Sequence, residues 1–236
     1  MQKKILSIVP AYNEEKNITI VVDEIKSSIP NCDVLVINDC SKDTTSAAAK
    51  KTGKANVVDL PCNLGIGGAV QTGFIYAYRN DYDYAVQIDG DGQHIPSEVN
   101  RLVEKIEETG CDMVIGSRFL DTESFRTTAA RRAGIKLFTF LYRILLGIKI
   151  TDGTSGFRIY NKKAIKFLSR YYPDDYPEPE AIVILVRNKF KVCEVGVKMR
   201  ERINGKSSIT PIKSLYYMVK VVMSIFFSHI RKLGGE

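Results

Sequence analysis

Short apolar runs rich in β-branched residues alternate with helix-forming segments throughout the first half of this chain. The runs expected to form strands are 4–10, 33–39, 55–60, 83–89 and 111–117. The helices expected between them begin at Asn13, at Asp43, at the glycine-rich stretch 65–73 and at Pro96. Such alternation builds a mostly parallel sheet covered by helices on both faces. We therefore expect an α/β protein whose ligands bind beyond the carboxyl ends of the strands.

The second half of the chain is less regular. Its expected elements are a helix at 129–147, a strand at 156–160, a helix at 161–170, a proline-rich loop at 171–180, a strand at 191–198 and a helix at 211–231. For 236 residues without an internal repeat or a Gly/Ser linker, the sequence predicts one domain with an appendage. We place the domain at 1–210 and an amphipathic helical extension at 211–236.

Cysteine usage and hydropathy bear on where the protein works. The five cysteines are Cys32, Cys40, Cys62, Cys111 and Cys193. They form no Cys-x-x-Cys pair and no Cys/His cluster, so we expect no zinc site and a reduced compartment. No stretch reaches the roughly 18 uncharged apolar residues of a membrane span, and the N-terminal apolar run is too short for a signal peptide. The sequence predicts a cytoplasmic protein that is soluble or bound to a surface.

Two aspartates one residue apart follow the fourth expected strand, in the run D-G-D-G-Q-H at 89–94. Neighbouring carboxylates repel each other unless a cation lies between them. Mg²⁺ or Mn²⁺ uses few protein carboxylates and completes its coordination with water and substrate phosphate oxygens. An isolated Asp-Gly pair is more often a plain turn, but the whole run at a strand end favours a metal site for a diphosphate at Asp89 and Asp91.

Three other polar segments also follow expected strands. They are P-A-Y-N-E-E at 10–15, N-D-C-S-K-D at 38–43 and N-L-G-I-G-G-A at 63–69. Taken alone, Asn13 and Asp43 read equally well as helix caps, and the glycines as a tight entry into a helix. The glycine run lacks the G-x-G-x-x-G form and follows the third strand rather than the first, which argues against a nicotinamide-binding enzyme.

Taken together, these segments resemble glycosyltransferase family 2, the inverting enzymes with the GT-A nucleotide-diphospho-sugar transferase fold. The resemblance also includes G-S-R at 116–118 and runs from about Leu6 to Ser208. Within the family, T-S-G-F-R at 154–158 and R-x-N-G-K-S-S at 202–208 look like the branch that transfers sugars to dolichyl or polyprenyl phosphate. The resemblance implies a nucleotide-diphospho-sugar donor and Mg²⁺ or Mn²⁺ as cofactor.

The resemblance also implies a role for individual residues. The nucleotide site would contain Pro10, Tyr12, Glu14 and Asp39, with Asp39 reading the base. Asp89 would contact the diphosphate or the metal, and Asp91 and Gln93 would hold the cation. Arg118, Arg131 and Arg202 would face the acceptor phosphate and the transferred sugar, with Arg132 as a substitute for Arg131.

The chain departs from the family pattern at two places. The family commonly has Asp-Asp-Gly-Ser after the second strand, and here Asn38 and Cys40 replace the first Asp and the Gly. The proline-rich run Y-P-E-P-E at 176–180 is also unusual for the polyprenyl branch. The first departure bears on the identity of the base, and the second on the sugar and the acceptor.

Charge is distributed unevenly along the chain. Residues 1–115 carry a net charge of −6 and residues 116–236 a net charge of +13. The basic half suits an anionic acceptor, because arginine binds phosphate oxygens in a bidentate fork. A phosphate monoester is already largely a dianion near neutral pH and needs no general base. A hydroxyl acceptor does need one, and for that case Asp152 is the candidate catalytic base.

Two apolar segments of the basic half carry narrow basic stripes, at 129–148 and 211–231. Either could pack on the sheet, but together they favour binding to a membrane surface or to a small membrane subunit. The first hypothesis is therefore transfer of a sugar to polyprenyl phosphate by a peripheral protein at the cytoplasmic membrane face.

A second hypothesis keeps the fold and uses a hydroxyl acceptor in cell-surface polysaccharide synthesis. A third, a non-catalytic basic adaptor, rests on net charge alone. The chain has no aromatic-basic pattern of a nucleic-acid module, so no nucleic-acid partner is expected. The sequence leaves the oligomeric state open.

Overall fold

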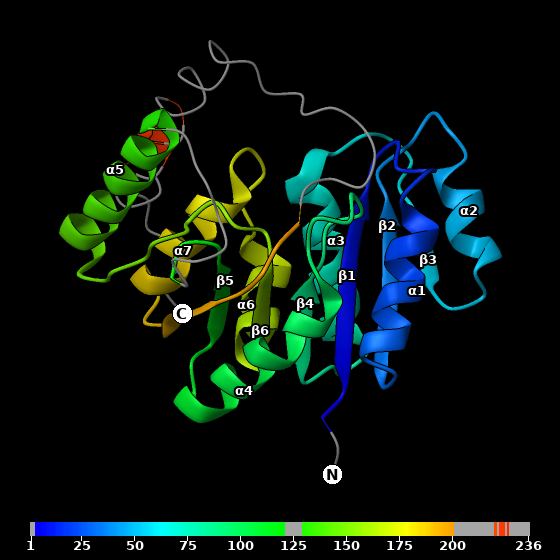
Figure 1. Ribbon diagram of the computed structural model, residues 1–236, viewed down its shortest axis with the longest axis horizontal. Coiled ribbons are helices and arrows are strands. Elements are labelled where there is room, and N and C mark those ends of the chain that lie inside the picture. The colour runs from blue at the N-terminus through cyan, green and yellow to red at the C-terminus, as the bar shows by residue number, and fades with distance from the viewer. Residues whose placement is uncertain (1–2, 121–128, 201–219, 221, 225, 227–236) are drawn as a thin grey trace.

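The computed structural model describes residues 3–120, 129–200, 220, 222–224 and 226, and the side chains of 129–133 and 135 lie outside this description. Within it, seven strands form one sheet in the order β3-β2-β1-β4-β6-β5-β7 (Figure 1). The strands are β1 (Ile5–Ala11), β2 (Cys32–Asn38), β3 (Asn56–Asp59), β4 (Tyr84–Gln87), β5 (Met113–Ser117), β6 (Arg158–Asn161) and β7 (Val192–Gly196). Only β6 runs antiparallel to its neighbours. The prediction of a mostly parallel α/β sheet is confirmed.

Helices cover both faces of this sheet, as expected. They are α1 (Ile18–Ser28), α2 (Thr45–Lys51), α3 (Gly65–Arg79), the 3₁₀ turn η1 (Pro96–Glu98), α4 (Val99–Thr109), α5 (Ala129–Leu146), α6 (Lys162–Tyr171) and α7 (Pro177–Arg187). Buried side chains of α1, α2 and α4 share one apolar cluster with the sheet. Side chains of α3, α5, α6 and α7 share the other.

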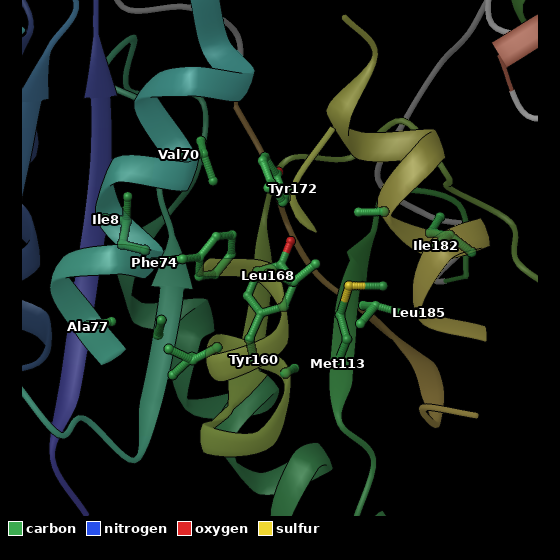
Figure 2. Packing of buried hydrophobic residues seen from close by; sticks show 14 of the residues in the cluster. Ile8, Val70, Phe74, Ala77, Met113, Tyr160, Leu168, Tyr172, Ile182 and Leu185 are labelled. Carbon is green, nitrogen blue, oxygen red and sulfur yellow. The ribbon is translucent and has the colours of Figure 1, made fainter. Parts of the chain in front are cut away.

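Strand β1 lies between these two clusters. Leu6 and Ile8 point into the α3 side, whereas Val9 and Ala11 point into the α1 side. Figure 2 shows the α3 side, where Phe74 packs edge-on against Tyr160 with ring centroids 4.9 Å apart. A strand buried on both faces requires an almost continuous apolar sequence, which explains the run ILSIVPA.

The proline-rich segment does not match its prediction. A loop was expected over 171–180, but α7 begins at Pro177 and continues to Arg187. Proline suits the first turn of a helix, where its missing N–H has no helical partner to lose. Acidic side chains in that turn also favour the helix, and the apolar run that follows is buried. The prediction gave too much weight to the prolines.

One further local prediction is wrong, and one pairing of residues was not predicted. The first helix begins at Ile18 rather than at Asn13, which adopts a left-handed φ of 57°. Cys111 and Cys193 form a disulfide, a pairing that the sequence did not predict. These cysteines are 82 residues apart in the chain, and parallel pairing of β5 with β7 brings them together.

The C-terminal extension lies largely outside the described residues. Residues 220, 222–224 and 226 are helical, and Val222 packs against the α3-side cluster. The proposed division at residue 210 stays a prediction.

We predict that Gly73→Ala destabilises the fold by about 1–3 kcal/mol, the usual cost of an overpacked core. A methyl group on Gly73 of α3 would lie 2.3 Å from Cγ2 of Ile8, and a β-branched side chain has little freedom to turn away. Urea unfolding would measure the change. The cost should shrink in an Ile8→Ala background, and a stabilising Gly73→Ala, the ordinary result inside a helix, would contradict the packing argument.

Candidate active site

A cleft of about 200 Å³ opens at the carboxyl ends of β1, β2 and β4. It is lined by Pro10, Ala11, Tyr12, Glu14, Asp39, Ile66, Ala69, Asp89, Gly90 and Asp91. The four residues predicted for the nucleotide site, Pro10, Tyr12, Glu14 and Asp39, lie here, together with Asp89 and Asp91, which were predicted to contact the diphosphate or the metal. The structure thus brings together residues from four separate segments of the chain.

Backbone hydrogen bonds beyond the strand ends build this cleft. The Asp39 N–H donates to Ala11 O at 2.9 Å, and the Gly90 N–H donates to Pro10 O at 3.3 Å. These contacts extend the pairing of β1 with its two neighbours past the sheet. Gly90 leaves room for the approach, because a Cβ there would lie 3.1 Å from Pro10 O.

Asp39 lies buried at the start of α3. Its two carboxylate oxygens accept the backbone N–H groups of Leu64 and Gly65, at 2.7 and 2.9 Å. These N–H groups have no partner within the helix, and a carboxylate there is stabilised by the helix dipole. The glycine run therefore serves the helix entry, one of the two interpretations the sequence left open: Gly65 has a φ of +75°.

Contacts and backbone conformation after β2 explain why Asn38 and Cys40 replace the Asp and Gly that are common in the family. The Asn38 amide donates to Asp59 at 2.9 Å and accepts the Ser41 N–H at 3.3 Å. An aspartate at this position would face the Asp59 carboxylate without a donor. Cys40 adopts a left-handed φ of 57°, a conformation that explains why glycine is common there.

The loop at 89–94 presents two carboxylates to the cleft. Asp91 is 5% exposed and accepts the Gln93 N–H at 3.0 Å, while the Asp89 side chain is 34% exposed. His94 stacks on Phe157 and accepts the Asp89 N–H through Nδ1 at 3.0 Å. Burial lowers the pKa of His94 despite the nearby aspartates, and the hydrogen bond that its Nδ1 accepts supports the loop.

This loop fits the proposed cation. Two carboxylates facing one cleft, with an amide side chain nearby on the same loop, match the oxygen ligands that Mg²⁺ and Mn²⁺ prefer. Among the described residues no group of three or more His, Cys, Asp or Glu side chains could form a full metal cage. The arrangement therefore suits an ion that shares its coordination with a substrate diphosphate.

Arg118 and Asp152 form a buried ion pair at the end of β5. Nε and Nη2 of Arg118 each donate to one Asp152 oxygen at 2.7 Å, and the Arg118 N–H donates to Asp152 at 3.1 Å. Burial alone lowers the pKa of Arg118, but the hydrogen bonds to Asp152 and its charge raise it above the ordinary value. Glu194 in turn accepts the N–H groups of Thr151 and Asp152, and burial raises its pKa.

This geometry argues against Asp152 as the catalytic base for a hydroxyl acceptor. Its side chain is 1% exposed and both of its oxygens are bonded to Arg118. A general base must reach the acceptor with a lone pair, so the contacts favour a role in orienting Arg118. Of the other predicted acceptor residues, Arg202 lies outside the described residues, and so do the side chains of Arg131 and Arg132 on α5.

Glu178 was missed in the sequence, because its segment was taken as a loop. It lies in the first turn of α7, and the fully buried Arg158 donates to its backbone oxygen at 2.7 Å. Burial raises the pKa of Glu178, the nearby Arg158 lowers it in part, and the charge of Asp89 raises it again. The described part of the chain offers this carboxylate no donor beyond its own backbone N–H.

Comparison with known proteins identifies the family. The family model described as glycosyl transferase family 2 matches residues 7–168. The chain belongs to glycosyltransferase family 2. It is therefore a glycosyltransferase, as its motifs predicted.

Related proteins support this assignment. The chain is 30% identical to polyprenol monophosphomannose synthase of Mycolicibacterium smegmatis, over 93% of this chain and 86% of that protein. It is 33% identical to UDP-N-acetylglucosamine–dolichyl-phosphate N-acetylglucosaminyltransferase of Methanococcus voltae, over 83% of this chain and 85% of that protein. The fold matches glucosyl-3-phosphoglycerate synthase from Mycobacterium tuberculosis, solved with Mn²⁺, UDP and phosphoglyceric acid, with a TM-score of 0.73 and 21% identity over 99% of this chain and 81% of that one. The expected GT-A fold is confirmed.

We predict that Gly156→Ala weakens Mn²⁺-dependent nucleotide binding about tenfold, the lower range for disturbing a group that orients metal ligands. A methyl group there would lie 2.9 Å from Gln87 Nε2 and 3.2 Å from Asp89 Oδ2. It would therefore disturb the 3.1 Å hydrogen bond that Gln87 Nε2 donates to Asp89 Oδ1. Calorimetric titration would measure binding, with the unfolding temperature as a control. Unchanged affinity in a folded variant would show that Asp89 tolerates the shift.

Proposed function

We propose that this glycosyltransferase transfers a sugar from a nucleotide-diphospho-sugar to a polyprenyl phosphate. For the donor, the proposal rests on the cleft, because the predicted nucleotide residues and the Asp89–Asp91 loop line the same cleft. Support for the acceptor half comes from the relatives named for polyprenol and dolichyl-phosphate transfer and from the basic second half of the chain.

The donor would lie along the floor of this cleft. Tyr12 is 44% exposed at its edge and offers an aromatic face to the base. Each Asp39 oxygen accepts one backbone N–H, which leaves lone pairs to read the base. The diphosphate would then reach Asp89, Asp91 and Gln93. A divalent cation held by these three would neutralise charge on the departing diphosphate.

Inverting transfer needs the acceptor oxygen in line with the bond to the diphosphate. Burial lowers the pKa of Arg118, but its hydrogen bonds to Asp152 and the charges of Asp152 and Asp89 raise it above the ordinary value, so the guanidinium is charged. The described residues leave its Nη1 group without a hydrogen-bond partner. We propose that Arg118 presents this group to the acceptor phosphate, with Arg131 and Arg202 as further contacts. Asp152 and Glu194 hold Arg118 in place through the hydrogen bonds described above.

The acceptor lipid requires contact with a bilayer. Leu137, Phe140 and Ile144 of α5 are 42%, 59% and 63% exposed, and Lys136 and Arg143 are exposed beside them. Helix α5 lies at the margin of the molecule, next to α7 (Figure 1). No helix of the described residues is long and apolar enough to cross a membrane. We propose peripheral attachment at the cytoplasmic face through this surface and the 211–236 extension, on lipid or on a small membrane subunit.

The direct test combines UDP-, GDP- and dTDP-sugars with polyprenyl phosphate and Mg²⁺ or Mn²⁺, scoring label that partitions into organic solvent. We predict that Asp91→Asn reduces transfer at least 10²-fold, as loss of a group that stabilises charge in the transition state does. Chelation of the metal should abolish transfer. Asp81→Asn, at an exposed site, is the matched control. Full transfer by Asp91→Asn would refute the proposal.

A hydroxyl acceptor is the second candidate, because the first turn of α7 supplies a further carboxylate, Glu178, for the role of general base. Burial raises the pKa of Glu178, the charge of Arg158 lowers it in part, and the charge of Asp89 raises it further. A raised pKa makes a carboxylate a stronger base near neutral pH. On this reading Glu178, rather than Asp152, would take the proton.

The two candidates predict different results for Glu178→Gln, which keeps the shape and removes the basic group. Transfer to a hydroxyl should fall by about 10²–10⁴-fold, the usual contribution of a general base. Transfer to polyprenyl phosphate should fall by less than about tenfold, since that acceptor has no proton to lose. Initial rates with both acceptor types would decide between them.

A further inference from the structure

The segment that follows β7 lies against the cation-binding loop, defined here as residues 89–94. Met199 pairs with His94 in an antiparallel bridge. The Arg200 N–H donates to Gln93 O at 3.1 Å, and Arg200 Nε donates to Gly92 O at 2.6 Å. One residue therefore binds two consecutive carbonyl groups of the loop.

The far end of the same guanidinium is attached to α1. Nη1 of Arg200 donates to Glu24 Oε1 at 3.1 Å, and Nη2 is paired with Glu24 Oε2. Both side chains are 34% exposed, so the ion pair by itself contributes little to stability. Its geometry matters more, because a planar guanidinium bound at three nitrogens has little freedom to turn.

These contacts reach the loop at Gly92 and Gln93. Gly92 adopts a φ of +77° and has no side chain to pack. The Gln93 N–H donates to Asp91, so the orientation of this peptide group also sets the Asp91 carboxylate. His94 secures the other end of the loop through the Asp89 N–H.

We propose that Arg200 is a positioning residue that holds the cation-binding loop so that Asp91 and Gln93 face the substrate diphosphate. This inference rests on the proposed function. Arg200 also lies two residues before Arg202, a predicted contact of the acceptor phosphate. Arg200 therefore connects the cation-binding loop with the segment that contains Arg202. Arginine is required for this role, because a lysine ammonium cannot span Gly92 O and both oxygens of Glu24.

The test measures Mn²⁺ binding by electron paramagnetic resonance, with saturating UDP or GDP, for the wild-type chain and its variants. We expect Arg200→Ala to weaken Mn²⁺ binding about 10–100-fold, the range for partners that orient metal ligands. Arg200→Lys should fall between Arg200→Ala and the wild type, and Glu24→Gln should have a smaller effect. Arg79→Ala, at an exposed residue of α3, is the matched control.

A second readout separates positioning from a general loss of structure. Transfer by Arg200→Ala should recover as Mn²⁺ is raised, and nucleotide binding without metal should not change. If Arg200→Ala does not fold, Arg200→Lys and Glu24→Gln carry the test. Wild-type Mn²⁺ affinity in the folded variants overturns this inference and leaves the proposed function standing. A wild-type chain that binds no Mn²⁺ with nucleotide and transfers no sugar overturns both.

Discussion

The site depends on the parallel pairing of β1 with β2 and β4. This pairing continues beyond the strands through Asp39 N–H to Ala11 O and Gly90 N–H to Pro10 O. Three loops that are distant in the sequence are thereby held at one sheet edge. Because β1 is buried on both faces, a shift of its register would move apolar side chains out of both clusters. The packing of the core thus fixes the position of the polar cleft.

Buried charged groups, rather than the sheet, hold the region that we propose for the acceptor. Arg118 is fixed by Asp152, whose backbone is bonded to Glu194. Arg158 donates to the carbonyl groups of Gly153, Ser155 and Glu178, which ties α7 to the segment before β6. A buried ion pair such as Arg118–Asp152 adds little net stability, but it restricts the orientations of both side chains. Such restriction favours catalysis, because charged groups already in place need no reorganisation during the reaction.

Much of this arrangement could be predicted from local sequence. Apolar runs separated by helical segments predicted the sheet, and polar residues at strand ends predicted residues that line the cleft, among them Asp89 and Asp91. The errors occurred where tertiary contacts override local signals. Prolines at 177 and 179 suggested a loop, yet burial of the following apolar run stabilises α7. Asp152 looked like an available base, and its engagement by Arg118 is visible only in three dimensions.

By itself, the sequence determined the α/β class, the family and the segments that supply the donor cleft. Each of these depends on residues near one another in the chain, through periodicity or a short motif. Only the tertiary structure decided which groups Asp39, Asp152 and Arg200 bind, and that Glu178 lies in a helix. Such pairings join residues from 25 to 176 positions apart. They depend on strand order and helix packing, which no local pattern encodes.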